Sequence, residues 1–190
     1  MPNLWIFISA LVVVYLLPGA DMILLLQTGA TEGRAHAIAT ALGLAAARVI
    51  HVALAAFGLA TLLRASPVAF DVMRYAGMAY LVWMGIGILR SWRHAPQTLE
   101  AQVSGHPSGY SRSTKRGFVT NVANPKALLF CSVLLPQFVA PASSTAGQFL
   151  LLGAILVAVG AAFDTLYSLA GASIGQWLGR HPFAYAVQQW

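Results

Sequence analysis

Long apolar stretches, each of about 20 residues and almost free of charge, dominate this sequence, and this is the length of α-helix that crosses the hydrocarbon core of a bilayer. Of its 190 residues, 58% are hydrophobic and 8% are charged, against about 25% charged in soluble domains. The hydrocarbon core holds no water, so backbone N–H and C=O groups must find hydrogen-bond partners within the protein. An α-helix supplies these partners within each segment. The pattern predicts an all-α membrane protein, a polytopic helical bundle in a lipid bilayer.

Five spans are predicted, at about residues 4–28, 35–63, 72–89, 117–140 and 149–178. The first has no Lys or Arg before it and continues through Asp21, so we expect a retained span and not a cleaved signal peptide. Residues 91–116 form the one sizeable polar stretch, with the Pro and Gly spacing of a linker. The linker separates a first three-helix half, residues 1–90, from a second half, residues 117–190, which holds two spans and a short tail.

Basic residues predict the orientation of the bundle, because short cytoplasmic loops carry an excess of Lys and Arg. Seven lie on the linker side of the predicted spans and two on the other side. The linker 91–116 is therefore expected in the cytoplasm and the N-terminus outside. Topology and attraction to anionic lipid also explain the formal charge of +6, so nucleic acid is not expected as a partner. The seven are Arg34, Arg90, Arg93, Arg112, Lys115, Arg116 and Arg180, and the two are Arg64 and Arg74.

Two helix-breaking clusters interrupt the apolar pattern. Pro18-Gly19-Ala20-Asp21 lies within the first span, and Asn124-Pro125-Lys126-Ala127 lies where a long apolar helix is predicted to begin after a polar loop. A proline frees a carbonyl of the preceding turn, and such a break persists in lipid only where it faces protein or a polar cavity. Broken helices at matching places in two halves indicate the binding site of a transporter. The sequence therefore favours a small-solute transporter.

Five ionisable residues fall inside the predicted spans: Asp21, Arg48, His51, Lys126 and Asp164. A charged side chain at a helix centre costs about 2.5–3.5 kcal/mol on insertion scales, so these groups should face one another or water. Arg48 and His51 are three residues apart and share one face of a helix. Three alternatives stay open: the groups pair only to hold the bundle together, Arg48 reaches toward an interface, or His51 is a satisfied core histidine.

An intramembrane enzyme would need paired acids in a protease motif, a Ser–His pairing, or clustered His and acids for a metal, and none is evident. The single cysteine, Cys131, excludes an intrachain disulfide and a Cys-based metal cluster, and we predict that it fills the core. The sequence therefore predicts no catalytic site, no metal and no cofactor.

Three sets of residues carry a resemblance to a known family. Pro18-Gly19-Ala20-Asp21 resembles the Pro-Gly-Pro-Asp signature near the start of the LysE/RhtB family of amino-acid exporters. Residues 75–86 are similar to that family's third span, which typically reads Gly-Ala-x-Tyr-Leu-x-Trp-Leu-Gly. The match covers nearly the whole chain, with its pieces in the family's order. The residues similar to the fourth span are Phe118, Asn121, Asn124-Pro125-Lys126 and Leu135-Pro136-Gln137-Phe138.

The resemblance implies a bacterial inner-membrane protein that exports amino acids or close derivatives and is driven by the proton gradient. It also implies two inverted halves of three helices each, a 3+3 arrangement. Carried over by position, Asp21, Asn124 and Lys126 would be central polar residues of the pathway. Pro18 and Pro125 would shape the two breaks.

The chemistry of an amino acid suits these groups, because a zwitterion needs an acceptor for its ammonium and donors for its carboxylate. We expect Asp21 to serve the ammonium, and Lys126, helped by Asn124, to serve the carboxylate. Proton coupling needs a group whose protonation competes with substrate. Asp21 and Asp164 are candidates for this role, with His51 a weaker one.

The chain departs from the family's pattern at three places. Ala20 stands where the signature has its second proline, so a milder first break is expected. Arg48 stands where the family usually has a small residue, so it either alters the preferred substrate charge or obstructs the path. A sixth span would follow residue 180, but ten residues remain, which as a helix reach about 15 Å into a core about 30 Å thick. We therefore expect the sixth span to be absent. The chain is then an exporter with five spans, a homodimer that completes its own surface, or a truncated, non-transporting homologue or subunit.

Overall fold

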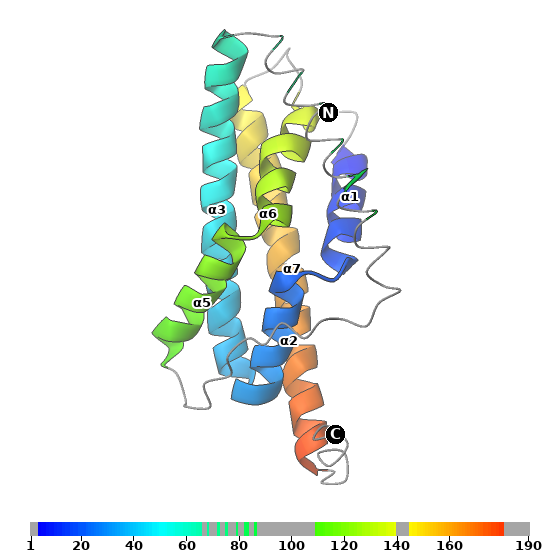
Figure 1. Ribbon diagram of the computed structural model, residues 1–190, viewed down its shortest axis with the longest axis vertical. Coiled ribbons are helices and arrows are strands. Elements are labelled where there is room, and N and C mark those ends of the chain that lie inside the picture. The colour runs from blue at the N-terminus through cyan, green and yellow to red at the C-terminus, as the bar shows by residue number, and fades with distance from the viewer. Residues whose placement is uncertain are drawn as a thin grey trace.

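The computed structural model describes residues 4–65, 109–139 and 145–180, together with single positions between 68 and 86. Within these residues every regular element is a helix, and the long helices lie side by side in a bundle (Figure 1). The predicted third span, most of the predicted linker and the tail after residue 180 lie outside the described residues. The described part therefore holds four of the five predicted spans.

Two helices and two bent helix pairs account for these four spans. Helices α3 and α7 are each long and apolar enough to cross a membrane. The pair α1 and α2 meets the same criteria when taken as one span bent by 54°, and so does the pair formed by α5 and residues 125–138, bent by 57°. The prediction of an all-α membrane bundle is confirmed. The elements are α1 (Leu4–Leu16), α2 (Ala20–Glu32), α3 (Arg34–Ala65), α5 (Tyr110–Val122), α6 (Pro125–Leu129), the π-helix η1 (Phe130–Leu134), the 3-10 helix η2 (Leu135–Phe138) and α7 (Thr145–Arg180).

Each bend has a local cause in the sequence. Helix α1 ends at Leu16 because Pro18 disfavours helical dihedrals at the residue before it, and α2 restarts behind Gly19. At the second bend Asn124 is the N-cap of α6, and its Oδ1 accepts a hydrogen bond from the Lys126 backbone N–H at 3.0 Å. Pro125 occupies the first helical position, where a missing N–H leaves no hydrogen bond unmade.

The second break follows a helix, whereas the sequence predicted a polar loop before it. Helix α5 begins at Tyr110, inside the stretch predicted as linker, and its buried residues Ser113, Gly117 and Asn121 recur every four positions. This spacing places them on one helix face. Three basic residues in the first turns of α5 lower its apolar character, so apolar content alone predicts a later start for this span, near Gly117.

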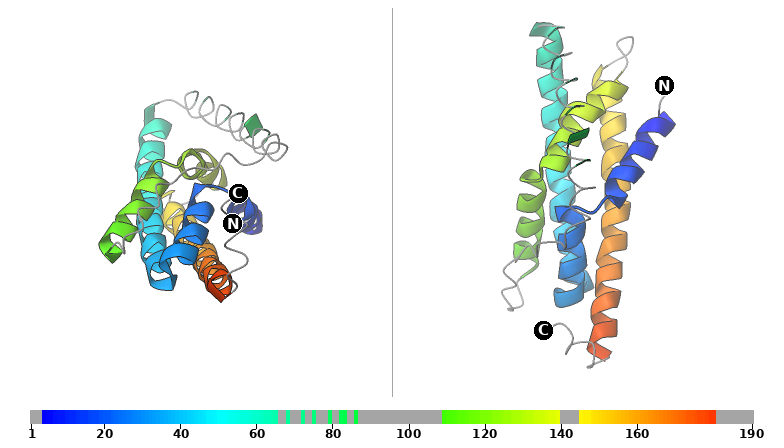
Figure 2. Two further views of the ribbon diagram at one scale, coloured as in Figure 1. Left: turned by 60° about the horizontal axis from the view of Figure 1, so that its bottom comes forward. Right: turned by 45° about the vertical axis from the view of Figure 1, so that its right-hand side comes forward.

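The two bent pairs run in opposite directions through the bundle. In Figure 1 and in the right-hand view of Figure 2, α1 lies in the upper half and α2 in the lower half, while α5 lies lower than α6 and leads up to it. The two breaks therefore meet near the middle of the bundle. Opposite directions are what two inverted halves require.

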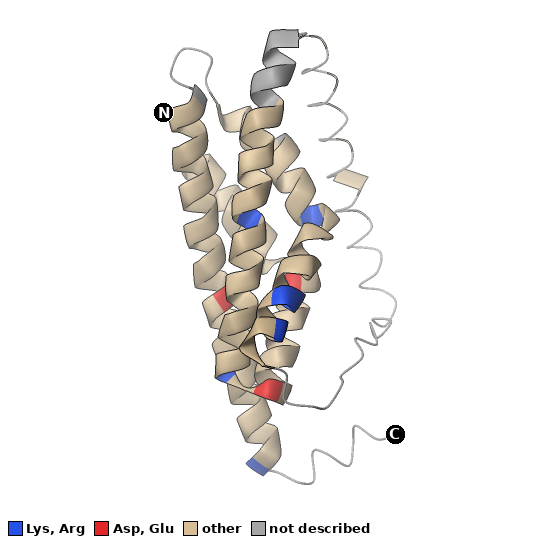
Figure 3. Cartoon of the chain, turned by 90° about the vertical axis from the view of Figure 1, so that its left-hand side faces the viewer, with Lys and Arg blue, Asp and Glu red and all other residues tan. Residues whose placement is uncertain are grey.

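One end of the bundle is basic. The start of α3 at Arg34, the first turns of α5 with Arg112, Lys115 and Arg116, and the end of α7 at Arg180 all lie at the lower end of Figure 1. In Figure 3 the coloured charges lie along the middle and lower parts of the bundle. Arg116 ties α5 to α2 there, since its Nη2 donates to Glu32 Oε1 and Thr28 Oγ1, each at 2.8 Å.

The upper half of the bundle is packed by an apolar cluster from α1, η1, η2 and α7. Its ring contacts include Phe7 with Phe138, whose centroids are 5.0 Å apart. Cys131 is a buried free thiol inside this cluster, as predicted for a core-filling residue. The buried members are Phe7, Leu11, Phe130, Cys131, Leu135, Phe149, Leu152 and Leu156.

Glycines bring the lower helices into close contact. A Cβ placed on Gly171 would lie 2.4 Å from the Leu26 carbonyl oxygen, and one on Gly117 would lie 2.1 Å from the Thr40 carbonyl oxygen. The first contact joins α2 to α7 and the second joins α3 to α5. Small residues allow this backbone approach in membrane bundles, where van der Waals packing drives helix association.

Gly175→Ala tests the contact between α2 and α7. A Cβ at Gly175 would lie 2.2 Å from the Ala30 carbonyl oxygen, so the substitution should lower the free energy of unfolding by about 1–3 kcal/mol. Gly179→Ala is the matched control on the same helix, because its Cβ would meet no described atom within 4 Å. It should be neutral or stabilise by roughly 0.5–1 kcal/mol. Thermal unfolding in detergent measures both variants, and equal melting temperatures would contradict the close packing.

Candidate functional site

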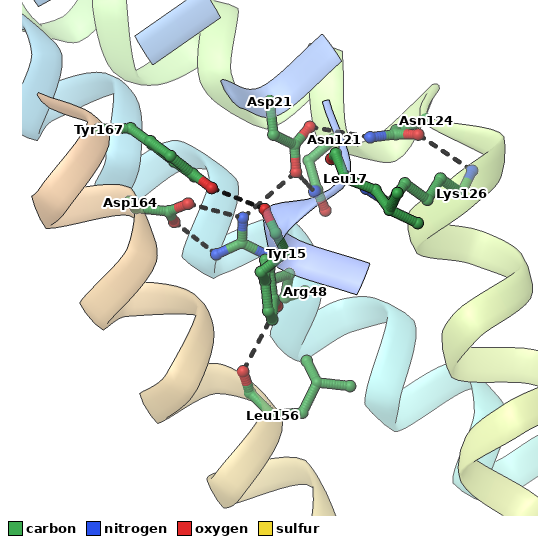
Figure 4. Close-up of polar contacts among 10 residues, drawn as sticks. All are labelled: Tyr15, Leu17, Asp21, Arg48, Asn121, Asn124, Lys126, Leu156, Asp164 and Tyr167. Carbon is green, nitrogen blue, oxygen red and sulfur yellow. Dashed lines mark hydrogen bonds and ion pairs between the residues drawn. The ribbon is translucent and has the colours of Figure 1, made fainter. Parts of the chain in front are cut away.

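The Asp21 carboxylate lies in the first turn of α2 and collects donors from both halves of the chain (Figure 4). Its Oδ2 accepts from Asn121 Nδ2 at 2.6 Å and from Arg48 Nη2 at 3.2 Å, and its Oδ1 accepts from Asn124 Nδ2 at 2.9 Å. A negative charge is favourable at the N-terminus of a helix. The first break thus places an acid where the second break supplies two amide donors.

Arg48 lies between two carboxylates. Its Nη1 and Nη2 donate to Asp164 Oδ2 at 2.5 Å and Oδ1 at 3.0 Å, a bidentate pair between α3 and α7, and its Nη2 also reaches Asp21. The side chains of Arg48 and Asp164 are each 3% exposed. A guanidinium that makes two parallel hydrogen bonds suits such a buried pair. The structure therefore brings together Asp21, Arg48 and Asp164, which the sequence had placed on three different spans.

Lys126 links the second break back to the first. Its Nζ donates at 2.9 Å to the Leu17 carbonyl oxygen, just after α1 ends. Carbonyls at a helix C-terminus lack intrahelical donors, and a cation there is favourable. Together with the amide contacts to Asp21, this bond means that each break supplies a charged group to the other.

Three further residues join this network, and the sequence had not assigned them to the site. Tyr167 Oη donates to the Tyr15 carbonyl oxygen at 2.7 Å, and the Tyr15 ring lies 5.3 Å from Arg48 Cζ, within the range of a cation–π interaction. Asn121 is fully buried and binds Asp21. The sequence did hold a signal for them, because each lies three residues from a predicted site residue, a spacing that places two side chains on one helix face. The pairs are Tyr15 and Pro18, Tyr167 and Asp164, and Asn121 and Asn124.

The other predicted site residues lie at the edge of this network. His51 is 4% exposed, one turn after Arg48 on α3, and its Nδ1 has no hydrogen-bond partner among the described residues. Pro18 lies in the first break and Pro125 begins α6, so both shape the backbone. None of these three residues is among those that line the cavity described next.

A cavity of about 50 Å³ lies between the two breaks, enough for a few water molecules at roughly 10–15 Å³ each. Its charged lining consists of Asp21 and Asp164 against Arg48 and Lys126, so two negative and two positive charges cancel. The remaining lining is mostly apolar and comes from α1, α2, α6, η1 and α7. The described lining therefore offers both signs of charge beside an apolar wall, and its formal charges sum to zero. Within the described ranges, no group of three or more His, Cys, Asp or Glu is arranged to hold a metal ion.

The sequence of this chain matches a family described as LysE type translocator over residues 12–188. The chain belongs to the LysE type translocator family. This confirms the resemblance drawn from the break motifs and the fourth-span residues. Translocators move solutes across membranes, so the chain is a transporter-family protein and not an enzyme.

Similar proteins include two that are named for the solutes they export. The homoserine/homoserine lactone efflux protein of Salmonella typhimurium is 32% identical over 161 residues, which are 85% of this chain and 76% of that protein. The leucine efflux protein of an Enterobacter species (strain 638) is 29% identical over 180 residues, 93% of this chain and 82% of that protein. An uncharacterized membrane protein of Vibrio cholerae is 30% identical over 178 residues, 93% of this chain and 84% of that protein. No solved structure matches the chain.

Proposed function

We propose that this chain exports amino acids or close derivatives across the bacterial inner membrane, driven by the proton gradient, from a site between its two helix breaks. The observation that carries the proposal is that Asp21 of the first break and Lys126 of the second line one cavity. Efflux of homoserine or leucine by relatives supports the amino-acid class. The breaks lie near the middle of the bundle, which supports a site at the bilayer midplane.

A free amino acid complements the two charges that line this cavity. Its ammonium would bind Asp21, whose carboxylate faces the cavity and is 18% exposed. Its carboxylate would bind Lys126, whose ammonium carries three N–H donors, one of them directed at the Leu17 carbonyl. The apolar part of the lining would contact the substrate's side chain.

Alternating access would follow from the contacts that cross the bundle at the two breaks. Substrate that binds Asp21 and Lys126 adds contacts that join the two breaks, so it biases how the bent pairs sit against each other. An inward-open state further requires that α2 and α5 separate at the basic end, where Arg116 binds Glu32 at 2.8 Å. Inverted halves, in which the two bent pairs correspond to each other, would supply the two states.

Proton coupling would use an acid that substrate and proton both bind. Asp21 meets this requirement because it faces the cavity, and Asp164 lines the same cavity from α7. His51 is a second route, since it is buried one turn from Arg48. The basic end with Arg34, the first turns of α5 and Arg180 would face the cytoplasm, as would the linker, because cytoplasmic loops are rich in Lys and Arg.

Export from intact cells tests the proposed function. A host stripped of its own exporters and loaded with dipeptides accumulates internal amino acids, and expression of this chain should release a subset of them. Cells with the empty vector are the control, and membrane insertion is checked on the same cells. Insertion without selective release would contradict the proposal and favour a non-transporting homologue.

A further inference from the structure

Arg48 divides its hydrogen bonds unequally between two acids. It makes two hydrogen bonds to Asp164, at 2.5 and 3.0 Å, and one longer bond to Asp21, at 3.2 Å. The Asp164 side chain is 3% exposed, whereas that of Asp21 is 18% exposed. Asp164 is therefore the more strongly bound acid, and the contact between Arg48 and Asp21 is the one that a ligand from the cavity can replace.

Asp21 has room for one more donor. A carboxylate offers about four acceptor sites on its two oxygens, and three donors from the described residues reach Asp21. Asn121 and Arg48 bind Oδ2, and Asn124 binds Oδ1. An ammonium that enters the cavity can bind Oδ1. Its repulsion of the nearby Arg48 guanidinium then favours release of the longer Arg48 bond to Oδ2, so the two cations compete for one negative charge.

The charge balance of the cavity limits what else can enter. Asp164 is occupied by Arg48 through two bonds, so a second positive charge on a substrate finds no uncommitted acid among the described lining residues. Such a charge would lie beside Arg48 and Lys126 in a space with few water molecules. Burying a charge without a partner is strongly unfavourable.

We propose that the Arg48 guanidinium competes with the substrate's ammonium for Asp21 and excludes substrates whose side chain carries a positive charge. Arg48 is thus a specificity-determining residue of the proposed site, and this inference rests on the proposed function. When substrate binds, Arg48 gives up its bond to Asp21 and keeps both bonds to Asp164. The pair between α3 and α7 persists through this exchange.

Two variants separate competition from charge exclusion. Arg48→Met removes the competitor and leaves Asp164 as an unpaired acid, so the cavity becomes negative. The variant should bind tritiated L-leucine or L-homoserine about tenfold more tightly, the change expected when one competing charge-assisted hydrogen bond is lost. It should also admit L-lysine, whose side-chain ammonium can bind Asp164.

The double variant Arg48→Met/Asp164→Asn restores the balance, because one acid and one base are removed together. It also avoids a buried acid without a partner, which would threaten folding of the single variant. It should keep the tighter binding of L-leucine or L-homoserine but still exclude L-lysine. Arg48→Lys keeps a positive charge at this position, so this variant should exclude L-lysine as the wild-type chain does.

Equilibrium binding to the purified full-length chain in phosphatidylethanolamine–phosphatidylglycerol nanodiscs measures these effects, with thermal unfolding to confirm folding. Tighter binding in the double variant, with L-lysine admitted only by the single variant, supports the inference. Unchanged or weaker affinity in the double variant, with wild-type binding intact, overturns it and leaves the proposed function standing. A wild-type chain that binds neither amino acid and exports none overturns the proposed function, and the inference with it.

Discussion

Asp21→Asn is expected to reduce export by about 100-fold or more, because a site built around a buried polar contact discriminates strongly once that contact is lost. The amide that replaces the carboxylate has a single acceptor atom, yet Arg48, Asn121 and Asn124 all direct donors at this side chain. It also carries two N–H donors of its own, which would face the donors around it. The variant therefore loses its attraction for a substrate ammonium, and it can no longer accept all three hydrogen bonds from Arg48, Asn121 and Asn124.

Export assays and binding in nanodiscs would measure this effect together. The matched control is Glu32→Gln, the same acid-to-amide change at the other end of α2, where Glu32 binds Arg116 at the basic end. Partly exposed pairs of this kind contribute about 0–1 kcal/mol, so the control should keep substrate affinity within about fivefold. If Asp21→Asn left export and its pH dependence unchanged, Asp21 would neither bind the substrate nor carry the coupled proton.

Lys126→Met is expected to abolish export while the second break still forms. Methionine keeps most of the unbranched stem but has no donor for the Leu17 carbonyl or for a substrate carboxylate. The N-cap of α6 is unaffected, because Asn124 accepts from the backbone N–H of residue 126 and not from its side chain. Loss of one charged hydrogen-bonding group should weaken binding by roughly 10- to 100-fold.

Lys115→Met is the matched control, because Lys115 is exposed near the start of α5 and is not among the residues that line the cavity. It should export at the wild-type rate. Binding of an amino acid with wild-type affinity by Lys126→Met would show that Lys126 serves only to join the two breaks. The carboxylate of the substrate would then need another partner.

The helix breaks and their charged residues were predictable because proline and charge are local signals. Pro18 and Pro125 mark the ends of α1 and the start of α6 without any knowledge of the tertiary structure. The energetic cost of charges in lipid likewise required that Asp21, Arg48 and Asp164 find partners. Residue-level reasoning could therefore reach the all-α bundle and the two breaks, and the resemblance of the motifs around the breaks added the family. A transport site at the breaks stays a proposal.

The identity of the partners was not predictable, because it depends on how helices from distant parts of the chain rotate against one another. Tyr167 and Tyr15 are 152 positions apart, and their contact exists only because α7 passes the end of α1. Lys126 was expected to bind substrate, but its bond to the Leu17 carbonyl appears only once the two breaks are placed face to face. The division into halves at residues 1–90 and 117–190 stays a prediction.

Flux through the purified chain in sealed lipid vesicles tests the central claim most directly. Vesicles loaded with tritiated L-leucine or L-homoserine would be followed with and without an imposed proton gradient, beside vesicles that hold Asp21→Asn. We predict release through the wild-type chain, acceleration by the gradient, and no release above background through the variant. Equal, background release from both, with insertion verified, would contradict a transport site at the two breaks.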